Sequence, residues 1–165
     1  MKKFFLLTVF VYALFSACTS DETTTYYLIR HAEKDRTNKT NRNPSLNTNG
    51  LLRAKRWAKH FEKIKLDAVY STDYKRTQQT AAPTAKSKGL RVQSYTPSKI
   101  YDSIFKKNTK GKTVLIVGHS NTTPLFANTI LDQKKYENMA DNDNASVYIV
   151  TLFNDKKSSE IKKIH

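Results

Sequence analysis

Short apolar runs alternate with amphipathic segments along most of the chain. Aliphatic, aromatic and β-branched residues cluster at 25–29 (TYYLI), 68–71 (AVYS) and 113–117 (TVLIV), which predicts three buried strands. The run at 113–117 is almost continuously apolar, as expected of a central parallel strand that is covered on both faces. A further short strand is predicted at 91–95. Segments 146–153 and 160–164, joined by a polar turn at 154–159, predict a terminal hairpin.

The segments between the first three strands show helical spacing. Apolar residues from Leu51 to Phe61 predict an amphipathic helix that is entered near Thr48. A second helix is predicted just after Asp73, its expected N-cap, and should run to Gly89 with a bend at Pro83. The intervening segment 34–49 is rich in Asn, Thr, Lys and Arg and predicts a long polar loop.

Two shorter helices are predicted in the second half of the chain. The first covers 98–107 and should turn Ile100, Ile104 and Phe105 inward. The second should have Thr123 as its N-cap, Pro124 in its first position, and an end near residue 131. Regular alternation of strands and helices predicts an α/β fold, a mostly parallel sheet with helices on both faces, with antiparallel edge strands contributed by 146–164.

The first residues form a segment of different character. Lys2 and Lys3 precede an apolar stretch at 4–15, which is typical of a secretory signal and short for a membrane span. Ser16-Ala17-Cys18 resembles a bacterial lipobox, in which the Cys is lipidated and becomes the mature N-terminus. We therefore expect a signal peptide at 1–17, a tether at 18–24, and a single domain at 25–165 in the cell envelope, lipid-anchored outside the cytoplasm. Ordinary secretion with an incidental Cys18 is the alternative.

The net charge of the chain indicates a chemical class of binding partner but not a particular molecule. The net charge is +15, and +13 without Lys2 and Lys3, so the protein should attract polyanions and phosphorylated molecules. The basic residues are scattered and no nucleic-acid motif is present, so nucleic acid is not an expected partner. Cys18 is the only cysteine, which excludes an internal disulfide and a Cys-based metal site. Nothing in the sequence indicates the oligomeric state.

Candidate chemistry is concentrated where the predicted strands end. Arg30 and His31 follow the first strand, His119 follows the strand at 113–117, and Arg76 follows the strand at 68–71. Open α/β sheets bind ligands at such ends. Guanidinium groups match phosphate oxygens, and a neutral imidazole can attack phosphorus, so His31 is the candidate nucleophile. His119 and Asn121 are candidate phosphate-binding residues, and the alternative for His119 is that it caps the following helix.

Four ordered segments, LIRHAEK, NPSLNTNGLLRA, STDYKRTQQTA and VGHSNTTP, resemble the signature segments of the histidine phosphatase superfamily, also called phosphoglycerate mutase-like. The chain resembles its small capless branch, which includes phosphohistidine phosphatases. The resemblance implies a three-layer sandwich and phosphorylation of His31. It also implies a phosphate clamp of Arg30, Arg76 and His119, with no metal and no cofactor.

Two positions depart from the family pattern. Ala32 stands where the first motif commonly has Gly, and no general acid is obvious; Glu33 is the first candidate for the proton donor. We expect a metal-independent phosphatase that hydrolyses phosphomonoesters or phosphoramidates through a phosphohistidine. Its substrate would be a small molecule, a glycolipid or a phosphoprotein. The alternative is a non-catalytic phosphate- or polyanion-binding lipoprotein with the same fold.

Overall fold

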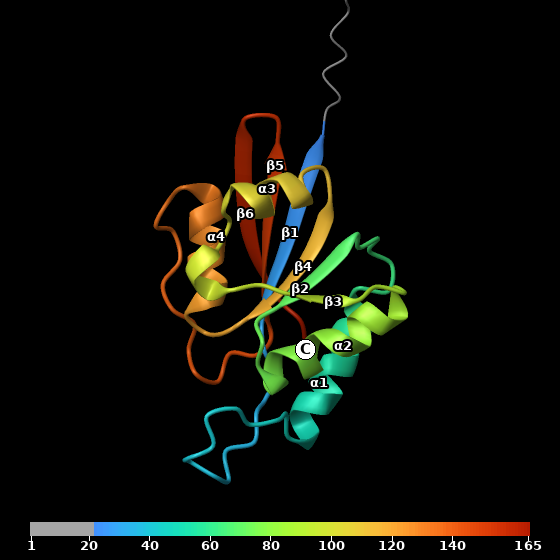
Figure 1. Ribbon diagram of the computed structural model, residues 1–165, viewed down its shortest axis with the longest axis vertical. Coiled ribbons are helices and arrows are strands. Elements are labelled where there is room, and N and C mark those ends of the chain that lie inside the picture. The colour runs from blue at the N-terminus through green and yellow to red at the C-terminus, as the bar shows by residue number, and fades with distance from the viewer. Residues whose placement is uncertain (1–21) are drawn as a thin grey trace, which may run out of the picture.

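The computed structural model describes residues 22–165 (Figure 1). The predicted signal peptide 1–17, Cys18 and tether residues up to 21 lie outside the described residues. Within the described part, one sheet has the strand order β3-β2-β4-β1-β5-β6. Four of its strands are parallel: β1 (Thr23–Arg30), β2 (Ala68–Ser71), β3 (Val92–Ser94) and β4 (Thr113–Gly118). β5 (Ser146–Phe153) and β6 (Lys156–Lys163) are antiparallel, which confirms the predicted α/β class.

Helices cover both faces of this sheet. α1 (Thr48–His60) and α2 (Lys75–Ser87) pack on one face, and α3 (Ser103–Thr109) and α4 (Thr122–Leu131) pack on the other (Figure 1). Successive strand residues supply the two cores, because side chains alternate across a strand. Leu28 faces Phe126 and the α3–α4 layer, whereas Ile29 faces Trp57 and the α1–α2 layer. The result is the expected three-layer sandwich.

The first and the last strand of the sheet are both longer than predicted. β1 begins at Thr23, so Thr23 and Thr24 belong to the sheet and not to the predicted tether; they pair with Phe153 and Leu152 of β5. β6 extends along the whole of β5, so the predicted turn at 154–159 shrinks to residues 154 and 155. The polar composition of β6 hides it from pattern analysis, because an exposed edge strand forms backbone hydrogen bonds without needing an apolar face.

α1 begins where it was predicted, whereas the N-cap residues of α2 and α4 differ from the predicted ones. Asn47 caps α1 by accepting a hydrogen bond from Gly50 N at 2.9 Å. Asp73 is not the N-cap of α2, because Tyr74 occupies that place and its own side chain forms no capping hydrogen bond. Instead, Lys75 N at the start of α2 donates to Asn43 Oδ1 of the polar loop at 2.9 Å. Thr123 is likewise inside α4, whose N-cap residue is Asn121.

The predicted helix at 98–107 is divided. A 3₁₀ turn covers Pro97–Lys99, and α3 begins only after Asp102, whose carboxylate accepts from Phe105 N at 2.8 Å. Tyr101 between them has φ 57°, which ends any continuous helix. This break changes the helical phase, so the prediction for Ile104 was wrong: its side chain is 68% exposed while Phe105 is buried. Across residues 22–165, none of the helices combines the length and apolar character needed to cross a bilayer.

Candidate active site

The predicted site residues lie at the carboxyl ends of β1, β2 and β4. Arg30 ends β1 and is paired with Gly118 of β4, and His31 N donates to the Gly118 carbonyl at 2.9 Å. This register brings the residues that follow β1 and β4 side by side. A cavity of about 430 Å³ at this edge is lined by five of the predicted residues and by neighbouring loops. The five predicted residues are Arg30, His31, Arg76, His119 and Asn121.

The His31 ring is fixed in one tautomer. Its Nδ1 lies 2.7 Å from the Ala32 carbonyl oxygen, and because a carbonyl only accepts, Nδ1 carries the proton and Nε2 keeps a lone pair. Burial lowers the pKa of His31 to about 3, and the positive charges of Arg30 and Arg76 act in the same direction. The imidazole is therefore neutral near pH 7, which is the state that a nucleophilic His requires.

The backbone around His31 is held from two sides. Asn144, which is buried just before β5, donates from Nδ2 to the His31 carbonyl at 2.8 Å. Ala32 N donates to Thr80 Oγ1 of α2 at 2.9 Å. Ala32 does not have a positive φ, so it adopts an ordinary backbone conformation at the position where the resemblance leads one to expect Gly.

His119 has the opposite tautomer. Arg76 Nη2 lies 3.4 Å from its Nδ1, and since a guanidinium only donates, Nδ1 is the acceptor. Nε2 then carries the proton and donates to Thr72 Oγ1 at 2.9 Å. Burial lowers the pKa of His119 to about 4, with a further contribution from the charge of Arg76. The side chain does not cap α4; instead the backbone N of His119 donates to Thr122 Oγ1.

The two arginines are oriented by different contacts. Arg30 is 3% exposed, and its Nη1 donates to the carbonyls of Ala140 and Asp141, each at 2.8 Å. The Arg76 guanidinium lies over the Tyr74 ring, 4.4 Å from the ring centre, a cation–π contact that holds it beside His119. Two fixed guanidinium groups beside a neutral His are chemically suited to a phosphate dianion.

Two carboxylates near His31 are paired with arginines. Glu33 accepts from Arg53 Nε at 2.7 Å, and it lines a neighbouring cavity, not the one that holds Arg76 and His119. Asp141 pairs with Arg30 at 2.9 Å and with Arg36 at 2.8 Å, and these hydrogen bonds lower its pKa to about 2. The Asp141 carboxylate is thereby held in the ionised form, which cannot donate a proton, and the Glu33 carboxylate contacts the Arg53 guanidinium. The role of Glu33 as proton donor stays a prediction, and in this structure its side chain lines the neighbouring cavity and not the one that holds Arg76 and His119.

The tertiary structure adds residues that sequence analysis missed. Thr72 and Tyr74 position His119 and Arg76, and Asp141 and Asn144 hold Arg30 and His31. The only sequence signal for the last two is the polar cluster DNDN at 141–144 directly before a strand. Over residues 22–165 there is no group of three or more His, Cys, Asp or Glu side chains arranged to hold a metal ion.

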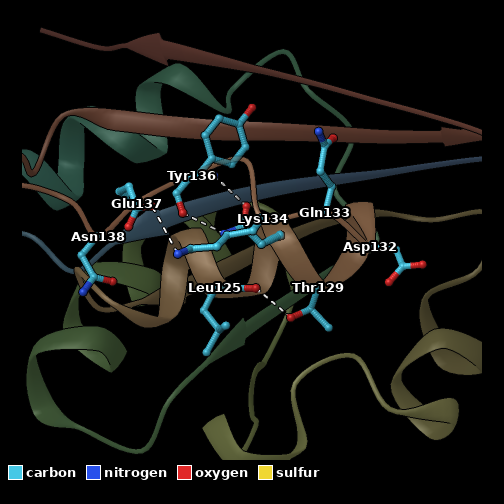
Figure 2. A pocket seen from close by; sticks show the side chains of 9 residues that line it. Leu125, Thr129, Asp132, Gln133, Lys134, Tyr136, Glu137 and Asn138 are labelled. Atoms are coloured by element: carbon cyan, nitrogen blue, oxygen red, sulfur yellow. Dashed lines mark hydrogen bonds and ion pairs between the residues drawn. The ribbon is translucent and has the colours of Figure 1, made fainter.

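A second pocket, of about 590 Å³, lies beside α4 (Figure 2). Leu125 and Thr129 of α4 line it together with Tyr136 and with the Lys134–Glu137 ion pair. None of the predicted site residues lines this pocket. We therefore locate the candidate chemistry at the His31 cavity.

Comparison with known proteins gives a family match and a fold match. The histidine phosphatase superfamily (branch 1) model matches residues 26–96. No curated protein sequence matches the chain. Among solved structures, a phosphoglycerate mutase from Bacillus anthracis str. Sterne is 16% identical with a TM-score of 0.65, and the match covers 85% of this chain and 93% of the other.

Two further solved structures have the same fold. A putative phosphohistidine phosphatase from Agrobacterium tumefaciens is 16% identical, with a TM-score of 0.63 and coverage of 84% of this chain and 97% of the other. A mycobacterial glucosyl-3-phosphoglycerate phosphatase is 13% identical, with a TM-score of 0.61 and coverage of 86% and 98%. Residues 26–96 thus carry the sequence signature of the histidine phosphatase superfamily (branch 1), and the described chain has the phosphoglycerate mutase-like fold.

Proposed function

We propose that this protein is a phosphatase that hydrolyses phosphomonoesters or phosphoramidates through a phosphohistidine at His31, without a metal ion. The observation that carries the proposal is the state of the His31 ring. It is neutral, its Nδ1 is held by the Ala32 carbonyl, and it lines one cavity with Arg30, Arg76 and His119. A lone pair on Nε2 beside two guanidinium groups is the arrangement that attack on a phosphate dianion needs.

The reaction has two steps. In the first, His31 Nε2 forms a bond to phosphorus while the bond from phosphorus to the leaving oxygen or nitrogen breaks. Arg30 and Arg76 neutralise the charge that gathers on the phosphoryl oxygens. In the second, water attacks phosphorus, the P–N bond breaks, and inorganic phosphate leaves with His31 again neutral. His119 faces the same cavity and would donate a hydrogen bond to a phosphoryl oxygen once its ring takes up a proton.

Leaving-group chemistry sets the substrate range in this proposal. Glu33 and Asp141 are both paired with arginines, so departing alkoxides would have to take their proton from water. Leaving groups of low pKa need little such help. Aryl phosphates should therefore react faster than simple alkyl phosphates. Phosphoramidates should also react faster, provided that their nitrogen already carries the proton with which it leaves as a neutral amine.

The test is hydrolysis of p-nitrophenyl phosphate by residues 22–165 in the presence of EDTA. The wild type should turn over, His31→Ala should lose at least about a thousandfold in kcat, and the matched control His165→Ala should behave as wild type. Acid-labile phosphate should be trapped on the wild type and not on His31→Ala. Turnover that stops with EDTA and returns with added metal would contradict the mechanism.

The same paired carboxylates favour a second candidate function, a non-catalytic phosphate- or polyanion-binding protein. In this alternative, the clamp binds phosphate and the absence of a proton donor leaves the bound ester uncleaved. Saturable binding of inorganic phosphate, with no turnover of p-nitrophenyl phosphate between pH 5 and pH 9, would favour the binding protein over the phosphatase.

We also propose that the protein is lipid-anchored through Cys18 outside the cytoplasm, where its substrates would be found. β1 runs from Thr23 to Arg30 (Figure 1), a length of roughly 25 Å at about 3.3 Å per residue. The cavity is lined by Arg30 and therefore lies at the end of β1 opposite Thr23. An anchor on the Thr23 side would hold the cavity away from the membrane, which favours soluble or protein-borne phosphates over lipid headgroups. Labelling of the wild type but not of Cys18→Ser by a radioactive fatty acid would support the anchor, and equal labelling would refute it.

A further inference from the structure

Lys34 lies where three cavities adjoin. It lines the His31 cavity together with Arg76 and His119, and it also lines a cavity of about 640 Å³ that shares His31 and Asp141. It lines a third, smaller cavity as well, formed by the polar loop that follows His31. A substrate whose phosphate occupies the His31 cavity would therefore extend past the Lys34 ammonium.

The Lys34 ammonium has no ion-pair partner among residues 22–165. Its neighbours are mostly cations: partial burial and the charges of Arg76 and Arg36 lower its pKa, and only Asp141 acts in the opposite direction. The carboxylates around it are already occupied, since Glu33 pairs with Arg53 and Asp141 is shared by Arg30 and Arg36. A half-buried cation held among other cations gains free energy when an anion joins it.

Arg36 provides a second group for the same anion. It lines the two cavities beyond His31, and its Nη2 is 2.8 Å from Asp141 Oδ2. The Arg36 side chain is 57% exposed, and an ion pair this exposed is weak, so an incoming anion can share or replace Asp141 at small cost. Lys34 and Arg36 therefore form a cationic subsite next to the phosphate clamp.

We propose that this subsite binds a second anionic group of the substrate, a carboxylate or a second phosphate, so that the preferred substrates carry two anions. The inference rests on the proposed function for the position of the first phosphate. It defines the substrate class more narrowly, because a phosphomonoester whose alcohol part carries no charge would place no anion beside Lys34.

Calorimetric binding at pH 8 tests the subsite without requiring turnover. The probes are phosphonocarboxylates of increasing chain length, each compared with the alkylphosphonate of equal length. Wild type should bind the best phosphonocarboxylate at least about tenfold more tightly than its matched alkylphosphonate, as expected of one charge-assisted hydrogen bond. In Lys34→Met this ratio should fall close to one. Lys156→Met, which removes the same charge from the hairpin at the far end of the sheet, should keep it.

Several results would overturn the inference. The affinity ratio of phosphonocarboxylate to alkylphosphonate could be near one for wild type at every chain length, or it could stay high in Lys34→Met. Alternatively, Lys34→Met could bind both probes more weakly by the same factor. The last result would place Lys34 on the phosphoryl group itself. Arg36→Gln offers a second variant, expected to lower the ratio, if Lys34→Met does not fold. Failure of the phosphatase proposal is seen separately, as absence of p-nitrophenyl phosphate turnover.

Discussion

The two site histidines should make the protein sensitive to mild acid. Both are neutral in the folded state because burial lowers their pKa values, to about 3 for His31 and about 4 for His119, from an ordinary value of 6.5. Below pH 6.5 the unfolded chain therefore binds more protons than the folded chain, and the free energy of unfolding falls as the pH falls. The stabilisation is complete above pH 6.5 and is lost progressively as the pH drops toward 3.

The size of the effect follows mainly from the unfolded state. Between pH 7 and pH 5 both histidines stay largely neutral in the folded protein but take up a proton in the unfolded chain. Each therefore lowers the free energy of unfolding by about 2 kcal/mol over this range. His119 should contribute somewhat less because its side chain is only partly buried. Together the two histidines lower the free energy of unfolding by at most about 4 kcal/mol between pH 7 and pH 5. This is a large fraction of the free energy of unfolding of a typical domain, which is roughly 5 to 15 kcal/mol.

Urea unfolding at pH 7, 6 and 5 measures this loss in wild type, His31→Asn and His119→Gln. Asn keeps a donor near the position of Nδ1, and Gln keeps one near Nε2, so each variant preserves the main hydrogen bond of the ring it replaces. Each variant should lose about 2 kcal/mol less than wild type between pH 7 and pH 5. His60, whose pKa is also lowered by burial, is present in all three proteins and cancels. Parallel curves for wild type and both variants would contradict the assignment of this loss to His31 and His119.

Three further predictions concern packing around the site. Asn144→Ala removes the donor to the buried His31 carbonyl, so unfolding measurements should show a loss of about 1 to 3 kcal/mol and kinetics a lower kcat; unchanged values for both would contradict the positioning role. Gly50→Ala directs a Cβ onto the Glu33 backbone, so α1 must shift away from the loop that carries His31, and we expect a loss of about 1 to 3 kcal/mol. Lys55→Ala, at an exposed position of the same helix, is the control, and wild-type stability of Gly50→Ala would be inconsistent with that contact. Trp57→Ala should lower the unfolding free energy by about 3 to 5 kcal/mol and Trp57→Phe by less, and equal losses would show that ring volume is not what matters.

Elements with a strong apolar pattern were predictable to within a residue or two. The strand at 68–71 has the predicted bounds, and α1 begins at Thr48, because a buried strand or an amphipathic helix must present apolar residues at a fixed period. The edge strand β6 and the break at Tyr101 were not predictable in this way. Their conformations depend on pairing with β5 and on packing against Tyr26, which are contacts between residues far apart in the sequence.

The site residues also differ in how far they could be predicted from the sequence. The sequence alone was enough to locate Arg30, His31, Arg76 and His119 after strands, because parallel strands end at one edge of a sheet. The folded structure was needed to find which ring nitrogen of each His carries the proton and that Glu33 pairs with Arg53. It also decided that Asp141 and Asn144 reach back to the first strand over more than a hundred residues. The reason is physical: periodicity reports which face of an element is buried, whereas protonation and hydrogen bonding depend on the atoms that the folded chain brings within about 3 Å.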